Sequence, residues 1–326
     1  MRTPPQGDGM PLLALDAIDY FITTLARPEC ILATASGTLF ASDRRGGVAV
    51  IRPDGTHSLI LARDPPPGFL PNGIALLRDG SFLIADVGGG GVWQLAQDGA
   101  LKPRILAVDG RTLPATNFVA ADDSGHVWAT VSTWAGERTV SARRGIFDGF
   151  IVVQDARGTR IAADGLGFTN EAKIDPTRRF IYVNETVARR LSRFPIRPGF
   201  ELGPRETVVQ FGEGCFLDGM DFDAEGGIWV TCLVSNRIYR ILPDTDDIRL
   251  ILADTDDEHV RAVEQKYQAG DFPGWHSGSV TGLPAPASIT FGGPDLRTAY
   301  IGFPLGERIA RFASPVTGAK PVYWDY

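Results

Sequence analysis

One pattern of short apolar segments and turns recurs along the whole chain, and it restricts the fold more than any other feature. The clearest copy covers residues 71–107, where Asp79-Gly80 and Asp98-Gly99 separate apolar runs. Asp-Gly between two apolar runs is a strong hairpin signal. We therefore expect four antiparallel strands in this copy, at residues 73–77, 81–86, 91–96 and 101–107. Four short antiparallel strands make one blade of a β-propeller.

The pattern occurs six times, which predicts one all-β domain over residues 1–326: a six-bladed β-propeller with four-stranded antiparallel blades. Successive inner strands start 45, 53, 48 and 70 residues apart. A propeller repeat is about 40–50 residues long, so the longest steps carry insertions. A β-sandwich with many hairpins is the alternative, but sandwiches do not repeat with this period. The copies cover residues 28–62, 71–107, 117–163, 170–211, 218–253 and 288–313.

Charge and cysteine content restrict the partners. The formal net charge is -7 and the chain has no basic run, so we expect no nucleic-acid partner. The three cysteines are widely spaced and predict no disulfide framework. The sequence shows neither a signal peptide nor a membrane span, so a cytoplasmic location without membrane contact is expected. The oligomeric state stays open.

Two insertions belong to loops that open on one face of a propeller, the face where the inner strands begin. They cover residues 133–149 and 254–287. The second starts with a predicted helix at 255–269, with Thr255 or Asp256 as its N-cap and Gly270 at its end. We interpret the pair as lids over one mouth. Tolerated surface insertion is the alternative.

A polar residue stands where each inner strand is expected to begin, facing the central channel. Two carboxylates and several amide oxygens there would form an all-oxygen site for one divalent cation. Ca²⁺ fits this set best, while Mg²⁺, Mn²⁺, Zn²⁺ and Fe²⁺ stay open. Ordinary turns are the alternative explanation of Asn72-Gly73 and Asp218-Gly219. The six residues are Glu29, Asn72, Asn117, Asn170, Asp218 and Ser288.

Motifs beside these polar residues resemble the SMP-30/gluconolactonase/LRE family of six-bladed propellers, across roughly residues 20–315. The resemblance implies that Glu29, Asn117, Asn170 and Asp218 bind a metal ion. It also implies that the chain hydrolyses a lactone, with Asp218 as the general base. The motifs are Pro28-Glu29, AADDSGHVWAT after Asn117, IDPTRRFIYVNE after Asn170, DFDAEGGIWVT after Asp218-Gly219, and TFGGPDLRTAYIG near the C-terminus.

The implied chemistry is metal-assisted ring opening of a small-molecule ester. The cation would bind the lactone carbonyl oxygen and stabilise the oxyanion. Asp218 or a metal-bound hydroxide would activate the water. Glu171 and Glu185 are further candidate bases or structural acceptors. Two other functions stay open: a non-hydrolytic, strictosidine-synthase-like propeller enzyme without a metal, and a ligand-binding or scaffold propeller.

The chain departs from the family at a substrate-binding position. Ala115 stands where sugar lactonases commonly have Arg, and Phe118 stands where they have Asp. We therefore expect a bulkier or less polar cyclic ester than a simple sugar lactone, bound by aromatic residues that include Phe147. The candidate substrate-binding residues are Asn72, Phe118, Trp134, Glu171, Trp275, His276 and Ser288.

Overall fold

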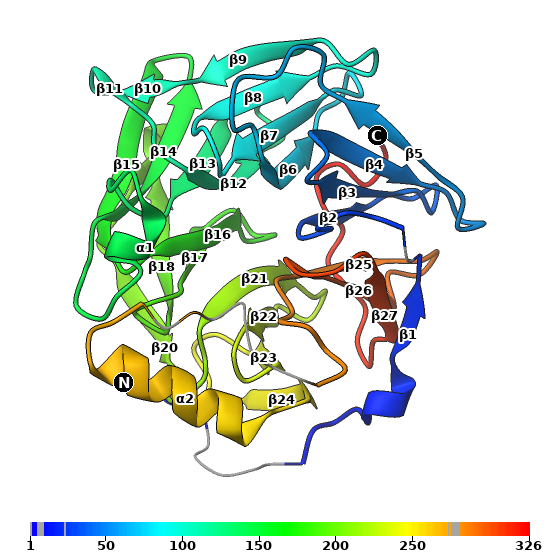
Figure 1. Ribbon diagram of the computed structural model, residues 1–326, viewed down its shortest axis with the longest axis vertical. Coiled ribbons are helices and arrows are strands. Elements are labelled where there is room, and N and C mark those ends of the chain that lie inside the picture. The colour runs from blue at the N-terminus through cyan, green and yellow to red at the C-terminus, as the bar shows by residue number, and fades with distance from the viewer. Residues whose placement is uncertain (1, 5–9, 23, 273, 275–280) are drawn as a thin grey trace.

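The computed structural model describes residues 2–4, 10–22, 24–272, 274 and 281–326. Within them, six antiparallel sheets stand around a central axis like the blades of a wheel (Figure 1). In each blade the strands run in chain order from the axis outward, apart from the last strand of the sixth blade. The predicted all-β, six-bladed propeller is therefore confirmed.

The strands of the blades are as follows. Blade 1 contains β2 (Ile31–Ala33), β3 (Leu39–Asp43), β4 (Gly47–Ile51) and β5 (His57–Leu61). Blade 2 contains β6 (Pro71–Leu76), β7 (Phe82–Asp86), β8 (Val92–Leu95) and β9 (Leu101–Ile105). Blade 3 contains β12 (Thr116–Ala121), β13 (Val127–Val131), β14 (Gly149–Asp155) and β15 (Gly158–Leu166).

The other half of the wheel follows the same plan. Blade 4 contains β16 (Thr169–Ile174), β17 (Phe180–Glu185), β18 (Arg190–Arg197) and β20 (Glu206–Gln210), with the short β19 (Glu201–Leu202) also paired to β18. Blade 5 contains β21 (Leu217–Phe222), β22 (Ile228–Cys232), β23 (Arg237–Ile241) and β24 (Ile248–Ala253). Blade 6 contains β25 (Ser288–Gly292), β26 (Thr298–Gly302), β27 (Ile309–Ala313) and β1 (Asp19–Phe21). A two-stranded hairpin, β10 (Ala107–Val108) and β11 (Arg111–Thr112), lies outside the blades.

The Asp-Gly turns lie where the sequence predicts them. In blade 2, Gly80 and Gly99 adopt φ angles of +80° and +86°, a left-handed conformation that glycine adopts without steric cost. Each turn therefore reverses the chain between two strands. The observed strands of this blade begin and end within two residues of the predicted ones.

Strand β1 closes the wheel. It pairs with β27 from the other end of the chain, in the register Asp19↔Arg311, Tyr20↔Ala310 and Phe21↔Ile309. Arg311 also forms an ion pair with Asp19 at 2.7 Å. The sixth blade therefore takes its outermost strand from the N-terminal region, which the repeated pattern does not reveal.

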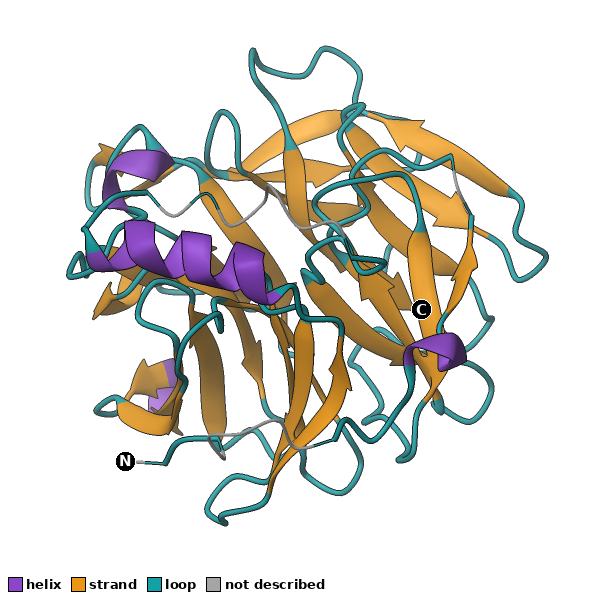
Figure 2. Cartoon of the chain, turned by 60° about the horizontal axis from the view of Figure 1, so that its bottom comes forward, coloured by secondary structure: helices purple, strands orange, loops and turns teal. Residues whose placement is uncertain are grey.

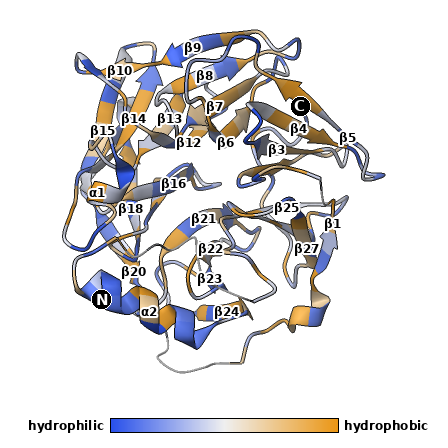
Figure 3. Cartoon of the chain, viewed as in Figure 1, coloured by the Kyte–Doolittle hydropathy of each residue, from blue (hydrophilic) through white to orange (hydrophobic). Residues whose placement is uncertain are grey.

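The apolar core lies between neighbouring blades. Trp229 of blade 5 is fully buried against blade 6, where its ring lies 5.2 Å from that of Phe291 and 6.3 Å from that of Phe312. On the other side of the wheel, Trp128 of blade 3 packs into a cluster with Phe194 of blade 4. Hydrophobic residues recur along the strands, whereas much of the long helix is hydrophilic (Figure 3).

Both insertions contain a helix, α1 (Arg138–Ser141) and α2 (Asp257–Gln268), and they lie on the same face of the wheel (Figure 2). The predicted helix in the second insertion is confirmed, because Asp256 caps α2 by accepting a hydrogen bond from the backbone N–H of His259 at 3.0 Å. Arg144 and Gln268 join the insertions by a hydrogen bond of 2.5 Å. Two short 3-10 helices, η1 (Leu15–Ala17) and η2 (Pro198–Phe200), complete the structure.

A membrane-spanning helix is not found in the described part of the chain, since none of its helices combines the required length and apolar character.

Candidate metal and substrate site

The inner strands of four blades break their hydrogen-bond ladder where a polar channel residue stands. The breaks lie at Asn72 in β6, Asn117 in β12, Asn170 in β16 and Asp218 in β21. A β-bulge leaves a residue unpaired and changes the direction of the side chains there. The same irregularity at equivalent positions of four blades indicates a built feature at the end of the channel where the inner strands begin, here called the site mouth.

Hydroxyl groups of the next strand stabilise three of the channel positions. In each case the residue after the polar one donates its backbone N–H to a Ser or Thr side chain, which replaces a ladder partner. These bonds join Cys30 to Ser42 Oγ (3.1 Å), Phe118 to Thr130 Oγ1 (3.1 Å) and Gly219 to Thr231 Oγ1 (2.9 Å). The sequence contains this signal as a hydroxyl residue 13 positions after Glu29, Asn117 and Asp218.

The glycines after Asn72 and Asp218 allow neighbouring blades to approach closely. A Cβ atom on Gly73 would lie 2.6 Å from Cα of Phe118, and one on Gly219 would lie 2.5 Å from Cα of Ser288. Both glycines lie inside strands, so Asn72-Gly73 and Asp218-Gly219 are not turns. The alternative explanation of these dipeptides is therefore wrong.

The polar residues predicted to face the channel are all buried, with between 3% and 7% of their surface exposed. Contacts connect several of them across blade boundaries. Asn72 Nδ2 donates to the backbone oxygen of Asn117 at 2.9 Å. Arg27 donates to Asn72 Oδ1 at 2.7 Å and forms an ion pair with Glu29. We call the set Glu29, Asn72, Asn117, Asn170, Asp218 and Ser288 the channel ring.

The charges of the channel ring act strongly on Asp218. Burial raises the pKa of Asp218 well above its usual value, and the nearby charges of Glu29 and Glu171 raise it further. The guanidinium groups of Arg138 and Arg27 act in the opposite direction. Two carboxylates in one buried space therefore favour a cation between them.

The ring residues fit a hard divalent cation. Among the described residues, the buried Asn170 Oδ1 and Ser288 Oγ have no hydrogen-bond partner, while Asn170 Nδ2 donates to Thr186 Oγ1 at 3.2 Å. The amide nitrogen of Asn170 is thus held by Thr186, whereas its amide oxygen, Oδ1, is available as a metal ligand. In the same described part, no group of three His, Cys, Asp or Glu side chains could hold a metal ion. A cation at the site mouth would depend on amide oxygens as well as carboxylates.

The two further acidic candidates have structural contacts. Glu171 Oε2 accepts a hydrogen bond from the backbone N–H of Met220 at 2.9 Å and lies 3.6 Å from Lys173 Nζ. Burial raises the pKa of Glu171 to about 7, although Lys173 opposes the rise. Glu185 is fully buried and accepts two hydrogen bonds from Arg190, at 2.8 and 2.7 Å. Both carboxylates thus connect strands.

The aromatic candidates are packed against protein. Phe118 is 4% exposed and belongs to a core cluster with Ile74. Trp134 stacks on Phe150 at 4.1 Å between ring centroids, and the Arg111 guanidinium lies 3.7 Å from the Trp134 ring. Phe147 is half exposed. The two remaining candidates, Trp275 and His276, lie outside the described residues.

Two arginines at the site mouth were not expected from the sequence. Arg27 precedes β2 and has a φ of +57°, which is uncommon for a residue with a Cβ atom. Arg138 lies in α1 and interacts electrostatically with Glu29, Asp218 and Arg27. In the family pattern the arginine stands instead at the position of Ala115. The sequence signal for Arg27 is its position two residues before Glu29.

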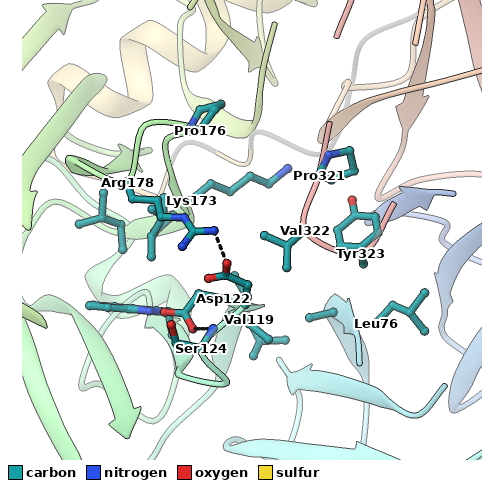
Figure 4. A pocket seen from close by; sticks show the side chains of 18 of the residues that line it. Leu76, Val119, Asp122, Ser124, Lys173, Pro176, Arg178, Pro321, Val322 and Tyr323 are labelled. Carbon is teal, nitrogen blue, oxygen red and sulfur yellow. Dashed lines mark hydrogen bonds and ion pairs between the residues drawn. The ribbon is translucent and has the colours of Figure 1, made fainter. Parts of the chain in front are cut away.

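A cavity of about 760 Å³ lies at the other end of the channel. Its walls are the later halves of the inner strands, the turns after them and the C-terminal segment, which includes Val322 and Tyr323 (Figure 4). Lys173 and Phe118 also line it. This cavity is distinct from the site mouth, because the channel ring lies at the beginnings of the same strands.

The chain matches the SMP-30/Gluconolactonase/LRE-like region over residues 27–256. It is similar to the 6-deoxy-6-sulfogluconolactonase of Pseudomonas putida, with 26% identity over 236 residues, or 69% of this chain and 66% of the relative. The match thus spans slightly less than two thirds of that relative.

Two solved structures share the fold. A gluconolactonase from Xanthomonas campestris has a TM-score of 0.67 and 18% identity, covering 97% of this chain and 98% of that chain. The calcium-binding protein regucalcin from Agrobacterium tumefaciens has a TM-score of 0.62 and 18% identity, covering 98% and 96%. At this identity the likeness concerns the fold alone.

Proposed function

We propose that this chain, which belongs to the SMP-30/gluconolactonase/LRE-like family, is a hydrolase that opens a lactone or related cyclic ester with one divalent cation. The observation that carries the proposal is the bulge repeated in four inner strands, which places polar residues at one channel mouth. Two of the similar proteins named above are lactonases, and a third binds calcium.

The residues proposed to hold the cation are Glu29, Asn117, Asn170 and Asp218. Their oxygens suit Ca²⁺ best among the divalent ions. The raised pKa of Asp218 and the unpartnered Oδ1 of Asn170 support this assignment. When bound, the cation would supply Lewis-acid polarisation of the lactone carbonyl.

Asp218 is proposed to accept the proton of the attacking water. A carboxylate held in a buried site by strand β21 is suited to this, because its position is fixed before the substrate arrives. The water oxygen would form a new bond to the carbonyl carbon, and the ring C–O bond would break. The proton taken by Asp218 would then go to the departing ring oxygen, leaving a hydroxy acid.

The expected preference for a bulkier, less polar ester has little support among the described residues. It depended on Phe118, Trp134, Phe147 and Trp275. Phe118 and Trp134 pack against protein, Phe147 is half exposed, and Trp275 lies outside the described residues. We therefore propose a lactone or cyclic ester as the substrate, without assigning it an apolar substituent.

Metal analysis combined with a lactone and ester panel tests the proposed function. The purified protein should contain one divalent ion, lose hydrolysis after chelation and regain it with Ca²⁺ or another divalent ion. Full activity in protein proven to be metal-free would refute the metal role. A bound cation with no hydrolysis of any ester would instead favour a non-hydrolytic or ligand-binding propeller.

A further inference from the structure

The two arginines at the site mouth differ in how their donors are used. Arg27 Nη1 donates to the Pro71 backbone oxygen at 3.2 Å, and its Nη2 serves Asn72 and Glu29. Within the described part of the chain, Arg138 forms a single hydrogen bond, a long one of 3.4 Å from Nη2 to Ser132 Oγ. Its buried Nε has no partner among the described residues. Arg138 therefore has more donors available for a ligand than Arg27, which already uses three of its five N–H groups.

The insertion that contains Arg138 is anchored at its base. Asp148 accepts hydrogen bonds from Thr133 Oγ1 at 2.7 Å and from Ser141 Oγ at 3.3 Å, which holds the two ends of the segment together. The Arg138 guanidinium also lies 5.2 Å from the centre of the Phe168 ring. These contacts keep the guanidinium beside the ring carboxylates without using its donors.

The balance of charge changes when a divalent cation is present. When all four side chains are ionised, the two carboxylates of Glu29 and Asp218 match in number the guanidinium groups of Arg27 and Arg138, with which they interact. A divalent cation leaves two positive charges in excess. Further along the channel, Glu171 and Asp221 share Lys173, at 3.6 and 3.8 Å, and provide one extra negative charge. At least one positive charge therefore stays uncompensated in a buried space, which is unfavourable.

We propose that the substrate carries an oxyanion group, such as a carboxylate or phosphate, in addition to its lactone ring, and that Arg138 binds this group. The inference rests on the proposed function. A guanidinium fork matches two oxygens of such a group in a bidentate arrangement. Arg27 acts differently, as a positioning residue that fixes Glu29 and Asn72 from a strained backbone.

A matched pair of lactones tests the inference. D-Glucaro-1,4-lactone differs from D-glucono-1,4-lactone by a carboxylate in place of a terminal CH₂OH. With metal-loaded protein, kcat/KM should favour the anionic lactone by about tenfold or more, the size expected for charge-assisted hydrogen bonds. Arg138→Gln should remove this preference. Arg143→Gln, an exposed arginine of the same insertion, should retain it.

Calorimetric binding gives a readout that does not need catalysis. Gluconate, glucarate and 6-phosphogluconate share a chain and differ in the terminal group, so they separate carboxylate from phosphate. At least one of glucarate and 6-phosphogluconate, which carry a second anionic group, should bind the metal-loaded protein about tenfold more tightly than gluconate, and Arg138→Gln should abolish the difference. Equal affinity for all three would overturn the inference, even if both lactones are hydrolysed.

The two proposals fail in different ways. Absence of hydrolysis with a retained, Arg138-dependent preference for a ligand with a second anionic group would refute the lactonase proposal and keep the anion site. Hydrolysis of both lactones with equal kcat/KM would refute the anion site and keep the lactonase proposal. If Arg138→Gln does not fold, Arg138→Lys replaces it. Lysine keeps the charge but lacks the guanidinium fork, so the preference for the more anionic ligand should fall severalfold. An unchanged preference would contradict bidentate binding.

Discussion

At the scale of single residues, the site mouth depends on charges that are buried and close together. Asp218 is 3% exposed, and its pKa is raised by burial and by Glu29. The side-chain carbonyl oxygen of the nearby Asn170 accepts no hydrogen bond from any residue that the structure describes. These groups would be costly in a purely structural channel, so we expect substitutions here to affect ligand binding and reaction more than folding.

Replacing Asp218 by asparagine should abolish most hydrolysis while keeping the fold. The substitution retains the shape of the side chain but removes a charge and the proposed proton acceptor, so kcat should fall by about 10²–10⁴. Rates with the best lactone of the panel, together with metal content, measure the effect. Asp98→Asn, an exposed turn residue, is the control. Wild-type rates in Asp218→Asn would show that another group is the base.

At the scale of elements, the bulges and close blade contacts determine where the polar side chains lie. Gly219 is the clearest case, because a Cβ atom would lie 2.4 Å from the backbone oxygen of Ala287 in the next blade. Backbone atoms cannot move aside as a side chain can, so this contact restricts the position to glycine.

Gly219→Ala should therefore destabilise the protein by about 1–3 kcal/mol, the usual cost of overpacking. Gly136→Ala is a matched control, since nothing lies within 4 Å of its added Cβ atom. Urea unfolding of both variants gives the free energies of unfolding. Equal stability of the two variants would contradict the close approach of blades 5 and 6.

Asp223 provides a second element-scale prediction, at the turn between β21 and β22. Burial would raise the pKa of Asp223, but hydrogen bonds from Arg240 (2.6 Å) and Trp229 Nε1 (2.9 Å) outweigh it and lower the pKa. A depressed carboxyl pKa stabilises the fold above the unfolded value of about 3.9, and the effect is lost as pH falls through the folded value.

Asp223→Asn should thus cost about 3 kcal/mol at pH 7, because it leaves the buried Arg240 with only the exposed Glu225 as a charged partner. The difference from wild type should shrink below about pH 4. Thermal unfolding across this pH range checks both statements. Asp247→Asn, which removes an exposed pair with Arg249, should cost under about 1 kcal/mol. A pH-independent difference for Asp223→Asn would show that its charge does not matter.

The sequence predicts those elements whose signals are local. Turn chemistry indicates the strands of each blade, and Asp256 indicates the start of α2. The channel ring could be predicted because a polar residue recurs at the start of every inner strand. By contrast, Arg138 depends on how an insertion folds over the mouth, which no local pattern indicates. The burial of Phe118 in the opposite half of the channel could not be predicted either, because it depends on packing between blades.

At the scale of the whole molecule, closure depends on a strand of three residues. Strand β1 has no hairpin partner nearby in sequence, since Asp19 pairs with Arg311. That separation explains why sequence periodicity does not reveal it. Joining the two ends of the chain in one blade prevents the wheel from opening between blades 6 and 1.

Tyr20→Pro should loosen this closure. Proline fixes φ at the centre of this three-residue strand and removes the Tyr20 ring from its contact with Phe303, so the melting temperature should fall by several degrees. Tyr20→Phe keeps the backbone and removes only the hydrogen bond from the Tyr20 hydroxyl to Gly282, so its effect should be smaller. Scanning calorimetry compares the two, and equal melting temperatures would show that β1 contributes little to closure.

The channel ring also has a consequence for the life of the protein in a cell. Its members come from all six blades, from Glu29 to Ser288, so no fragment shorter than residues 29–288 contains the complete set. A ligand that bridges all six residues can bind only after the last blade has docked, and binding to the native state alone stabilises it in proportion to the logarithm of ligand concentration. The supply of that ligand would then determine how long each newly made copy escapes degradation, separately from any effect on turnover.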